Sequence, residues 1–347
     1  MNKEVGLQWG RGIAAVSVVI GHAIAHPYQH APEQAHLMGR AGVTLFFVIS
    51  GYIMVLTTGA GRFDPAIFMR KRILRIVPLY YLATFVLAAG ALFVPQLFKS
   101  TAFNINQITT SLLFIPAYTP ESDAIEPFMK LGWTLNFEMF FYAVFALLFW
   151  LTALQRAVAL SMLFGSLMIV GQMVTFTDAI PAYYTRIDLL GFVAGVWLAV
   201  LAKRYEWKLK RWAGWAGLAT ALALTAYVSA AYGQIRSHLE TQILLVGICT
   251  LYVAVLALGE QWFVHIVPGW MTRVGDATYS IYLFHMFAIG AVTTLGARFV
   301  PPDLRLIVIV TAAALGVALG MFVYQHIEVH MSRLTGRWGA SPRPKTT

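Results

Sequence analysis

The sequence predicts an all-α, polytopic integral membrane protein with about ten transmembrane helices. Of its 347 residues, 59% are hydrophobic and only 12% are charged, and the mean hydropathy is +0.69. Soluble domains carry about 25% charged residues, so they are excluded as a class. Apolar runs of about 20 residues, the length that crosses a bilayer, recur along the chain.

Ten apolar segments are long enough to span, and each is predicted as one helix. They lie at 6–27, 39–60, 74–95, 131–152, 157–176, 186–203, 212–232, 239–259, 276–297 and 304–325. Pro27, Pro95, Pro181 and Pro268 mark helix ends, where the chain leaves the bilayer. The apolar run 108–115 is too short to cross and is expected at the membrane interface.

The distribution of lysine and arginine predicts the orientation. An even number of helices places both termini on one side, and Arg11 lies inside a helix. Seven of the other basic residues lie on the opposite side: Arg40, Lys99, Lys130, Arg186, Arg236, Arg298 and Arg305. The remaining basic residues, more than twice as many, lie on the side of the termini, which is therefore predicted to be cytoplasmic. We expect a single transmembrane domain over 1–330 and a short, disordered cytoplasmic tail over 331–347.

Charge and cysteine content exclude several functions. The net charge of +10 sits in short loops, where it sets topology and meets anionic lipid heads or an anionic ligand rather than nucleic acid. The single cysteine, Cys249, excludes an internal disulfide and a cysteine-based metal cluster. No cleavable signal is evident, because the first apolar segment contains Arg11 and ends at a poor cleavage site.

The first predicted helix carries two costly side chains. Arg11 and His22 have ten residues between them in GRGIAAVSVVIGH, which is about 16 Å along a helix axis. A charge and an imidazole inside lipid each need a buried partner or a ligand. The spacing favours an anion clamp near one face and an acid/base group well inside.

Four more stretches contain polar residues within or beside apolar segments. They are GVTLFFVISGY (42–52), FMRKRILRIVPLYY (68–81), GWTLNFEMFFY (132–142) and GDATYSIYLFH (275–285). In content and order the five stretches resemble the acyltransferase 3 family of polytopic membrane acyltransferases, especially its exopolysaccharide acetyltransferase branch. The resemblance is strong over the first 150 residues and moderate around 275–285, whereas the fifth to eighth predicted helices match mainly in hydropathy.

The resemblance implies the reaction and several site residues. Family members move an acyl group, usually acetyl, from cytoplasmic acyl-CoA to a hydroxyl of a glycan or lipid-linked sugar, with no permanently bound cofactor. Arg11 and His22 match the catalytic arginine–histidine pair, and Arg72 and Arg75 match the arginine pair of the third helix. Further matches are Gly42, Phe46, Phe47, Ser50 and Gly51 in the second helix and Glu138 in the fourth. Asn136 stands where many members have serine, which bears on the acceptor more than on the reaction class.

The predicted helix directions indicate how deep these residues lie in the membrane. Glu138, on an inward helix, is expected at the depth of His22, and His285 near the midplane, so the three would share one buried pocket if their helices are neighbours. His22 is predicted as the base that takes the acceptor's proton. Glu138 would orient the His22 tautomer or bind the sugar, and these roles stay open. Ser50, Tyr142 or a backbone amide between Gly42 and Gly51 would stabilise the oxyanion.

The basic cluster at the start of the third helix predicts the donor site. The guanidinium groups of Arg72 and Arg75, with Arg11 behind them, suit phosphate in a bidentate geometry. They would clamp the phosphates of CoA while its pantetheine arm carries the thioester to the histidine.

Each assignment has a structural alternative. His22 and His285 would then serve helix packing, Arg11 would snorkel to the interface, and Arg72 and Arg75 would be topological anchors. The four-residue spacing of His22, His26 and His30, followed by His36, resembles a metal site. However, Pro27 breaks the helix and Glu33 is the one acidic or cysteine ligand at suitable spacing, so no metal is predicted.

The sequence therefore predicts an O-acyltransferase of the bacterial inner membrane. Its partners would be acyl-CoA, a glycan or lipid-linked sugar, membrane lipids and proteins of polysaccharide synthesis. The alternatives are a secondary transporter or exporter whose intramembrane charges form a path, and a non-catalytic scaffold.

Overall fold

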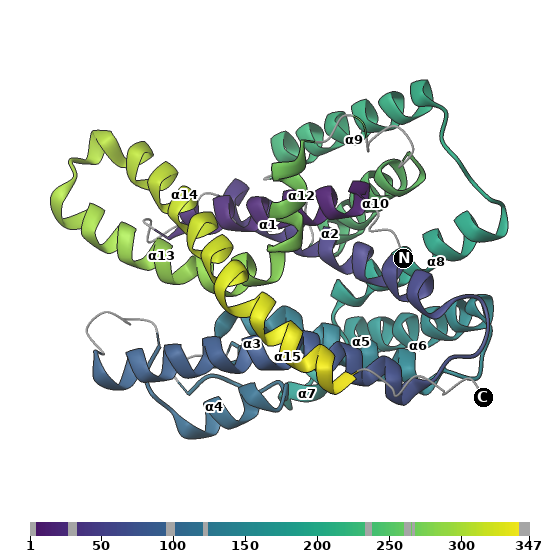
Figure 1. The fold of residues 1–347 in the computed structure, drawn as a ribbon, viewed down its shortest axis with the longest axis horizontal. Coiled ribbons are helices and arrows are strands. Elements are labelled where there is room, and N and C mark those ends of the chain that lie inside the picture. Colours follow the sequence, from purple (N-terminus) through teal and green to yellow (C-terminus); the bar gives the residue numbers. More distant parts are fainter. Residues whose placement is uncertain are drawn as a thin grey trace.

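The apolar segments of the chain form helices. The computed structural model describes residues 5–26, 33–94, 101–120, 124–232, 238–259, 265 and 268–339. Within these ranges the regular elements are helical, and the extended backbone forms one isolated bridge, between Tyr118 and Ile125. One helix of 15 or more residues overlaps each of the ten predicted segments, with bounds that differ by up to nine residues; Figure 1 shows these helices. They are α1 (Val5–Ala25), α2 (Glu33–Thr58), α3 (Pro65–Phe93), α5 (Trp133–Leu147), α6 (Ala153–Met173), α8 (Leu190–Arg204), α9 (Arg211–Ala231), α10 (His238–Leu258), α13 (Thr278–Phe299) and α14 (Arg305–Val323).

Short helical elements connect the long ones. They are α4 (Ile105–Leu112), η2 (Lys130–Gly132), α7 (Ala179–Tyr184), η3 (Ile187–Leu189), α12 (Gly269–Asp276), η5 (Pro302–Leu304), the π-helical η6 (Tyr324–Glu328) and α15 (Val329–Gly339). The run 108–115 contributes to α4, whose Ile108 is buried against Ala88 and Ala91 of α3. Its relation to the membrane surface stays a prediction. Pro268 caps α12 and Pro181 lies inside α7, whereas Pro27 and Pro95 fall outside the described residues.

Among the described residues, seven helices are long and apolar enough to cross a membrane. They comprise α2, α3, α6, α9, α10, α13 and the continuous run that begins with α14. The helices α5 and α8 have 15 residues each, about 22 Å, which is shorter than the roughly 30 Å hydrocarbon core. The chain thus has the make-up of a polytopic membrane protein, while the number ten and the cytoplasmic termini stay predictions.

Close glycine contacts set the register of α2 against its neighbours. A Cβ on Gly42 would lie 2.6 Å from the carbonyl oxygen of Ala14, and one on Gly21 would lie 2.8 Å from that of Ala35. These contacts make α1 and α2 antiparallel. We call the end of the bundle where α1 begins and α2 ends the basic side. On its other flank α2 meets α8, where a Cβ on Gly51 would lie 2.1 Å from the Phe192 oxygen.

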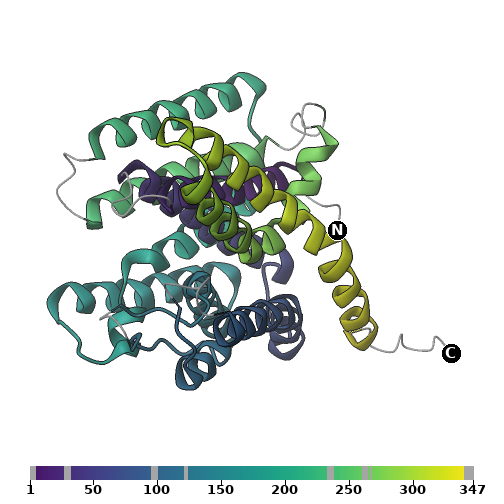
Figure 2. The ribbon, with the colours of Figure 1, turned by 90° about the vertical axis from the view of Figure 1, so that its left-hand side faces the viewer.

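The helix α5 begins inside the bundle. Gly132, just before it, packs against the ring of Tyr80, which lies 15 residues after Pro65 and so about halfway along the 29-residue α3. The carbonyl oxygen of Leu131 accepts a hydrogen bond of 2.8 Å from the Tyr282 hydroxyl. The prediction that the helix of 131–152 begins at the outer end of the bundle is therefore wrong. Figures 1 and 2 show α3 to α7 grouped on one side of the molecule and α9, α13 and α14 on the other.

The last long helix contains a π turn. α14 passes into η6 and then into α15 (yellow in Figure 1), which reaches across to α3. π turns are rare and occur often at functional sites. α15 extends to Gly339 and contacts α3, while the disorder expected of the tail over 331–347 stays a prediction. Residues 340–347 lie outside the described ranges.

Candidate active site

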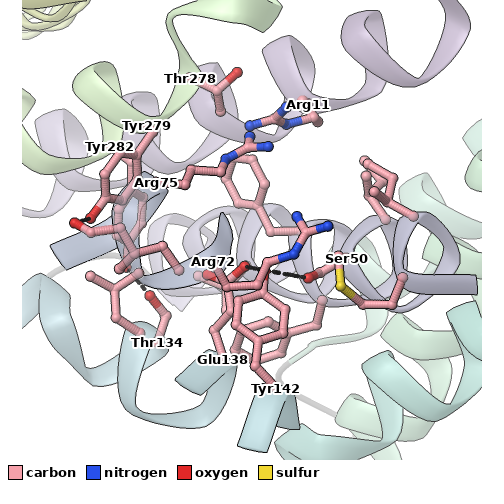
Figure 3. Close-up of a pocket in the computed structure, with 18 residues that line it drawn as sticks. Arg11, Ser50, Arg72, Arg75, Thr134, Glu138, Tyr142, Thr278, Tyr279 and Tyr282 are labelled. Atoms are coloured by element: carbon pink, nitrogen blue, oxygen red, sulfur yellow. Dashed lines mark hydrogen bonds between the residues drawn. The ribbon is translucent and has the colours of Figure 1, made fainter. Parts of the chain in front are cut away.

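One cavity opens between five helices and collects most of the predicted site residues. Side chains of α1, α2, α3, α5 and α13 line it, and its empty volume, open mouth included, is about 760 Å³. Figure 3 shows the polar side chains that point into it. They include Arg11, Ser50, Arg72, Arg75, Glu138 and Tyr142, and Phe46 and Phe47 line it as well. We call this space the arginine cavity.

Three guanidinium groups line the cavity. Arg72 is only 8% exposed and donates from Nη2 to Thr57 Oγ1 at 3.3 Å. Its guanidinium carbon lies 5.7 Å from the Tyr142 ring centre, and its Nε is buried without a partner within the described residues. Arg75, one turn later, is exposed at the mouth, and Arg11 faces both from α1 (Figure 3). The unpaired Nε of the buried Arg72 cation makes the cavity receptive to an anion.

Glu138 lies among these cations and is held by two hydroxyl groups. Ser50 Oγ donates to Glu138 Oε1 at 3.3 Å, and the Tyr142 hydroxyl donates to the same oxygen. The hydroxyl oxygens of Ser50 and Tyr142 also lie 3.2 Å apart. The carboxylate is within electrostatic range of Arg11 and Arg72, so it is their counter-charge, fixed in place by α2 and α5.

Sequence reasoning missed five polar residues of this region. Thr134 of α5 and Thr278, Tyr279 and Tyr282 from the start of α13 line the cavity, although GWTLNFEMFFY and GDATYSIYLFH contain them. The fifth, Glu328 of the π turn, accepts a hydrogen bond of 2.5 Å from Ser280 Oγ and lies within electrostatic range of Arg75 and Arg11. An acid directly after an apolar run was the signal that could have found it.

The two predicted histidines meet elsewhere. His22 Nδ1 lies 2.8 Å from His285 Nε2, and His285 is completely buried. Neither histidine lines the arginine cavity. The structure thus brings His22 and His285 together, as expected, but in a separate place.

Depth explains why Glu138 is not with them. Gly21, beside His22, packs on Gly39, whereas Gly10, beside Arg11, packs on Ile49. Glu138 is bound to Ser50 and therefore lies at the depth of Arg11, about 16 Å along α2 from Gly39. The predicted common depth of Glu138 and His22 is wrong, because α5 begins inside the bundle. The same separation places Glu138, Ser50 and Tyr142 away from His22, while their predicted roles in orienting the His22 tautomer and in stabilising the oxyanion stay untested.

The ring of Tyr282 separates the cavity from the histidine pair. Tyr282 lines the cavity, and its ring centre lies 6.3 Å from that of His285. Phe46 lies edge-on to Tyr282 at 6.2 Å. The Tyr282 hydroxyl is fixed to Leu131 and Thr134, so the far end of the cavity stops one ring short of the histidines.

The remaining predicted residues lie apart from this site. Asn136 is 1% exposed and its side-chain amide lacks a partner among the described residues, but it does not line the cavity. His26 lies 2.8 Å from Thr293 Oγ1, and His30 falls outside the described ranges. In the described part of the chain, no group of three His, Cys, Asp or Glu residues is placed to hold a metal.

Comparison with known proteins identifies the family. The profile of the acyltransferase 3 family, described as an acyltransferase domain, matches residues 4–324. The chain belongs to this family. It is therefore an O-acyltransferase with the make-up of a membrane protein.

Relatives of this acyltransferase support the same assignment. It is 37% identical over 280 residues to the exopolysaccharide production protein ExoZ of Rhizobium meliloti, an alignment that covers 77% of this chain and 83% of the relative. It is 27% identical over 321 residues to nodulation protein 10 of Rhizobium leguminosarum, covering 82% and 83%. A putative acetyltransferase of Acidianus two-tailed virus is 29% identical over 199 residues, covering 57% and 54%. No solved structure matches the chain significantly.

Proposed function

We propose that this acyltransferase moves an acyl group, acetyl in the first instance, from cytoplasmic acyl-CoA to a sugar hydroxyl of a cell-surface or lipid-linked glycan. The observation that carries the proposal is the arrangement of two sites along one axis. An arginine-rich cavity opens at the basic side, and a buried histidine pair lies one ring beyond its far end. A long anionic thioester fits this arrangement.

The charges of the cavity favour the donor. Arg11, Arg72 and Arg75 face the carboxylates of Glu138 and Glu328, so positive charge is in excess where the cavity opens. Guanidinium groups bind phosphate in a bidentate manner. We assign Arg72 and Arg75, backed by Arg11, to the phosphates of CoA, and Glu138 to holding Arg11 and Arg72 in position.

We assign the acid/base chemistry to His22. Its Nε2 would take the proton of the acceptor hydroxyl as the oxygen attacks the thioester carbonyl. The new C–O bond forms, the C–S bond breaks, and the proton passes from Nε2 to the leaving sulfur to give CoA and the ester. A neutral imidazole can do both steps without a metal or a bound cofactor.

The relatives support a glycan acceptor. ExoZ is named for exopolysaccharide production, so a polysaccharide or its lipid-linked precursor is the proposed acceptor. The proposed location is the bacterial inner membrane, with CoA reaching the protein from the cytoplasm at the basic side. Proteins of polysaccharide synthesis are its natural neighbours.

Inverted membrane vesicles test the proposal. With labelled acetyl-CoA and the glycan acceptor, the wild type is expected to form labelled ester, and His22→Ala is expected to form none. The matched control is His330→Ala, an exposed histidine of α15, which should retain full activity.

Three results would reject the proposal. Uptake of an unmodified solute without release of CoA would show a transporter. Intact ester formation in His22→Ala would show a scaffold or a different base. Mass spectrometry of surface glycans with and without the gene would identify the modified sugar, and identical spectra would exclude a glycan acceptor.

A further inference from the structure

The imidazoles of His22, which is half-buried, and His285, which is buried, lie end to end. His22 Nδ1 and His285 Nε2 are 2.8 Å apart, the ring planes differ by 12° and the ring centres are 5.1 Å apart. That separation is close to the N–N distance plus one centre-to-nitrogen distance for each ring. The rings are therefore nearly coplanar, and the lone pair of one nitrogen points along the N–H bond of the other, as in an N–H···N hydrogen bond.

A backbone carbonyl fixes the direction of this hydrogen bond. His285 Nδ1 lies 2.9 Å from the carbonyl oxygen of Ile281. A carbonyl oxygen accepts and never donates, so the proton is on His285 Nδ1. A neutral imidazole carries one proton, which leaves His285 Nε2 as an acceptor. His22 Nδ1 must then be the donor.

We propose that His285 is a positioning residue that holds neutral His22 in the Nδ1–H tautomer and leaves His22 Nε2 bare. When one ring nitrogen of a neutral imidazole donates a hydrogen bond, the other nitrogen carries no proton and is free to react. In the described part of the chain, His22 Nε2 has no hydrogen-bond partner. The inference rests on the proposed function, in which His22 Nε2 is the base.

Packing keeps His285 in this position. The residue is completely buried, and α14 supports it through Gly316, where a Cβ would lie 3.2 Å from the Cβ of His285. Ile281, one turn earlier on α13, contacts Gly320 of the same helix. The carbonyl that orients His285 is thus clamped between α13 and α14.

The arrangement also suits the charged intermediate. When His22 Nε2 takes the acceptor proton, the imidazolium still donates from Nδ1 to His285 Nε2, and the hydrogen bond becomes charge-assisted. The proton of His285 stays on Nδ1, bound to the Ile281 carbonyl, so no proton is lost to His285. The proton on His22 Nε2 therefore remains available to the leaving sulfur.

A spectroscopic experiment tests the tautomer without using activity. Wild-type protein with ¹⁵N-labelled histidine rings is purified in detergent, and the His22 signals are assigned by their loss in His22→Ala. The Nδ1 of neutral His22 should show the shift of a protonated nitrogen and its Nε2 that of a bare one. A protonated Nε2 in neutral His22 would overturn the proposal.

Two substitutions at one position test its effect on turnover. His285→Phe removes the acceptor and should lower kcat about 100-fold with the KM for acyl-CoA unchanged, because the arginine cavity is elsewhere. His285→Gln places an amide oxygen near the former Nε2 and should restore at least a tenth of the wild-type kcat. Equal loss in both variants, or full activity of His285→Phe, would overturn the proposal.

His26→Phe is the matched control. His26 also joins α1 to α13, through Thr293, so this variant disturbs the same helix contact without touching the pair. Its kcat should stay near the wild-type value. The two proposals fail separately: an active His22→Ala protein rejects His22 as the base, whereas an Nε2–H tautomer in the wild type rejects the role of His285 and Nε2 as the basic atom, but not acyl transfer that depends on His22.

Discussion

The ring of Tyr282 stands between the arginine cavity and the ring of His285, whose centre is 6.3 Å away. Its hydroxyl is tied to the Leu131 carbonyl and to Thr134, so this wall is held by α5 and the segment before it. Phe46, which meets Tyr282 edge-on, has no such polar tether. An acyl chain that enters from the basic side would therefore reach the histidines past Phe46 rather than past Tyr282.

Removing the Phe46 ring should let water reach the histidine pair. In Phe46→Ala we expect acyl-CoA hydrolysis without acceptor to rise several-fold, because the cavity then joins the space beside His285. Release of CoA in the absence of glycan measures this. Phe85→Ala removes a ring that is 53% exposed on α3 and should leave hydrolysis at the wild-type level. Unchanged hydrolysis in Phe46→Ala would contradict the path.

Arg72→Ala should weaken donor binding. A hydrogen-bonded charge pair is worth roughly 1.5–3 kcal/mol, so the KM for acyl-CoA should rise at least about tenfold, with a smaller fall in kcat, because phosphate binding is shared by ground and transition states. Steady-state kinetics in vesicles measure both constants. Arg70→Ala removes an exposed arginine from the same helix and is the control. An unchanged KM in Arg72→Ala would reject the clamp.

Glu138→Gln should lower turnover at least tenfold while the protein still inserts. The amide can accept from Ser50 or Tyr142, but the negative charge that faces Arg11 and Arg72 is lost, and buried cations without a counter-charge shift toward other partners. Ester formation per inserted protein measures the effect. Glu126→Gln, in a half-exposed pair with Lys130, should retain activity. If Glu138→Gln is fully active, its place in the site is rejected.

Gly51→Ala should destabilise the bundle. The new Cβ would lie 2.1 Å from the Phe192 carbonyl oxygen, so α2 and α8 must separate, and overpacking of this kind costs about 1–3 kcal/mol. The midpoint of thermal unfolding in detergent should fall by several degrees. Gly165→Ala on α6 has open space around it and should be neutral or slightly stabilising. Equal midpoints for the two variants would contradict this tight crossing.

Hydropathy located the long helices well, because burial in lipid demands apolar runs of a defined length. It could not give their depth. The apolar run after Leu131 looks like a full span, yet α5 starts halfway along α3 and has 15 residues. Because α5 starts at this depth, Glu138 lies near Arg11 and not near His22. The depth depends on the packing of Tyr80 and Tyr282 against the start of the helix.

In the site, too, the sequence identified several residues, whereas their arrangement depends on the packing of the helices. Arg11, Ser50 and Arg72 stood out because polar groups in apolar helices are costly, and they do share one cavity. Tyr279 and Tyr282 were missed because tyrosines are ordinary residues of membrane helices. The pairing of His22 with His285 was expected, but its direction needed the position of the Ile281 carbonyl.

The π turn makes the end of the last helix sensitive to length. Glu328 meets Ser280 because η6 contains one residue more than an α-helical turn would hold. Deletion of one residue between 324 and 327 would restore regular winding and rotate Glu328 by about 100° about the helix axis. The acid would then face a different neighbour, and α15 would meet α3 with another face. Changes in residue number are thus expected to be less tolerated here than changes in residue type.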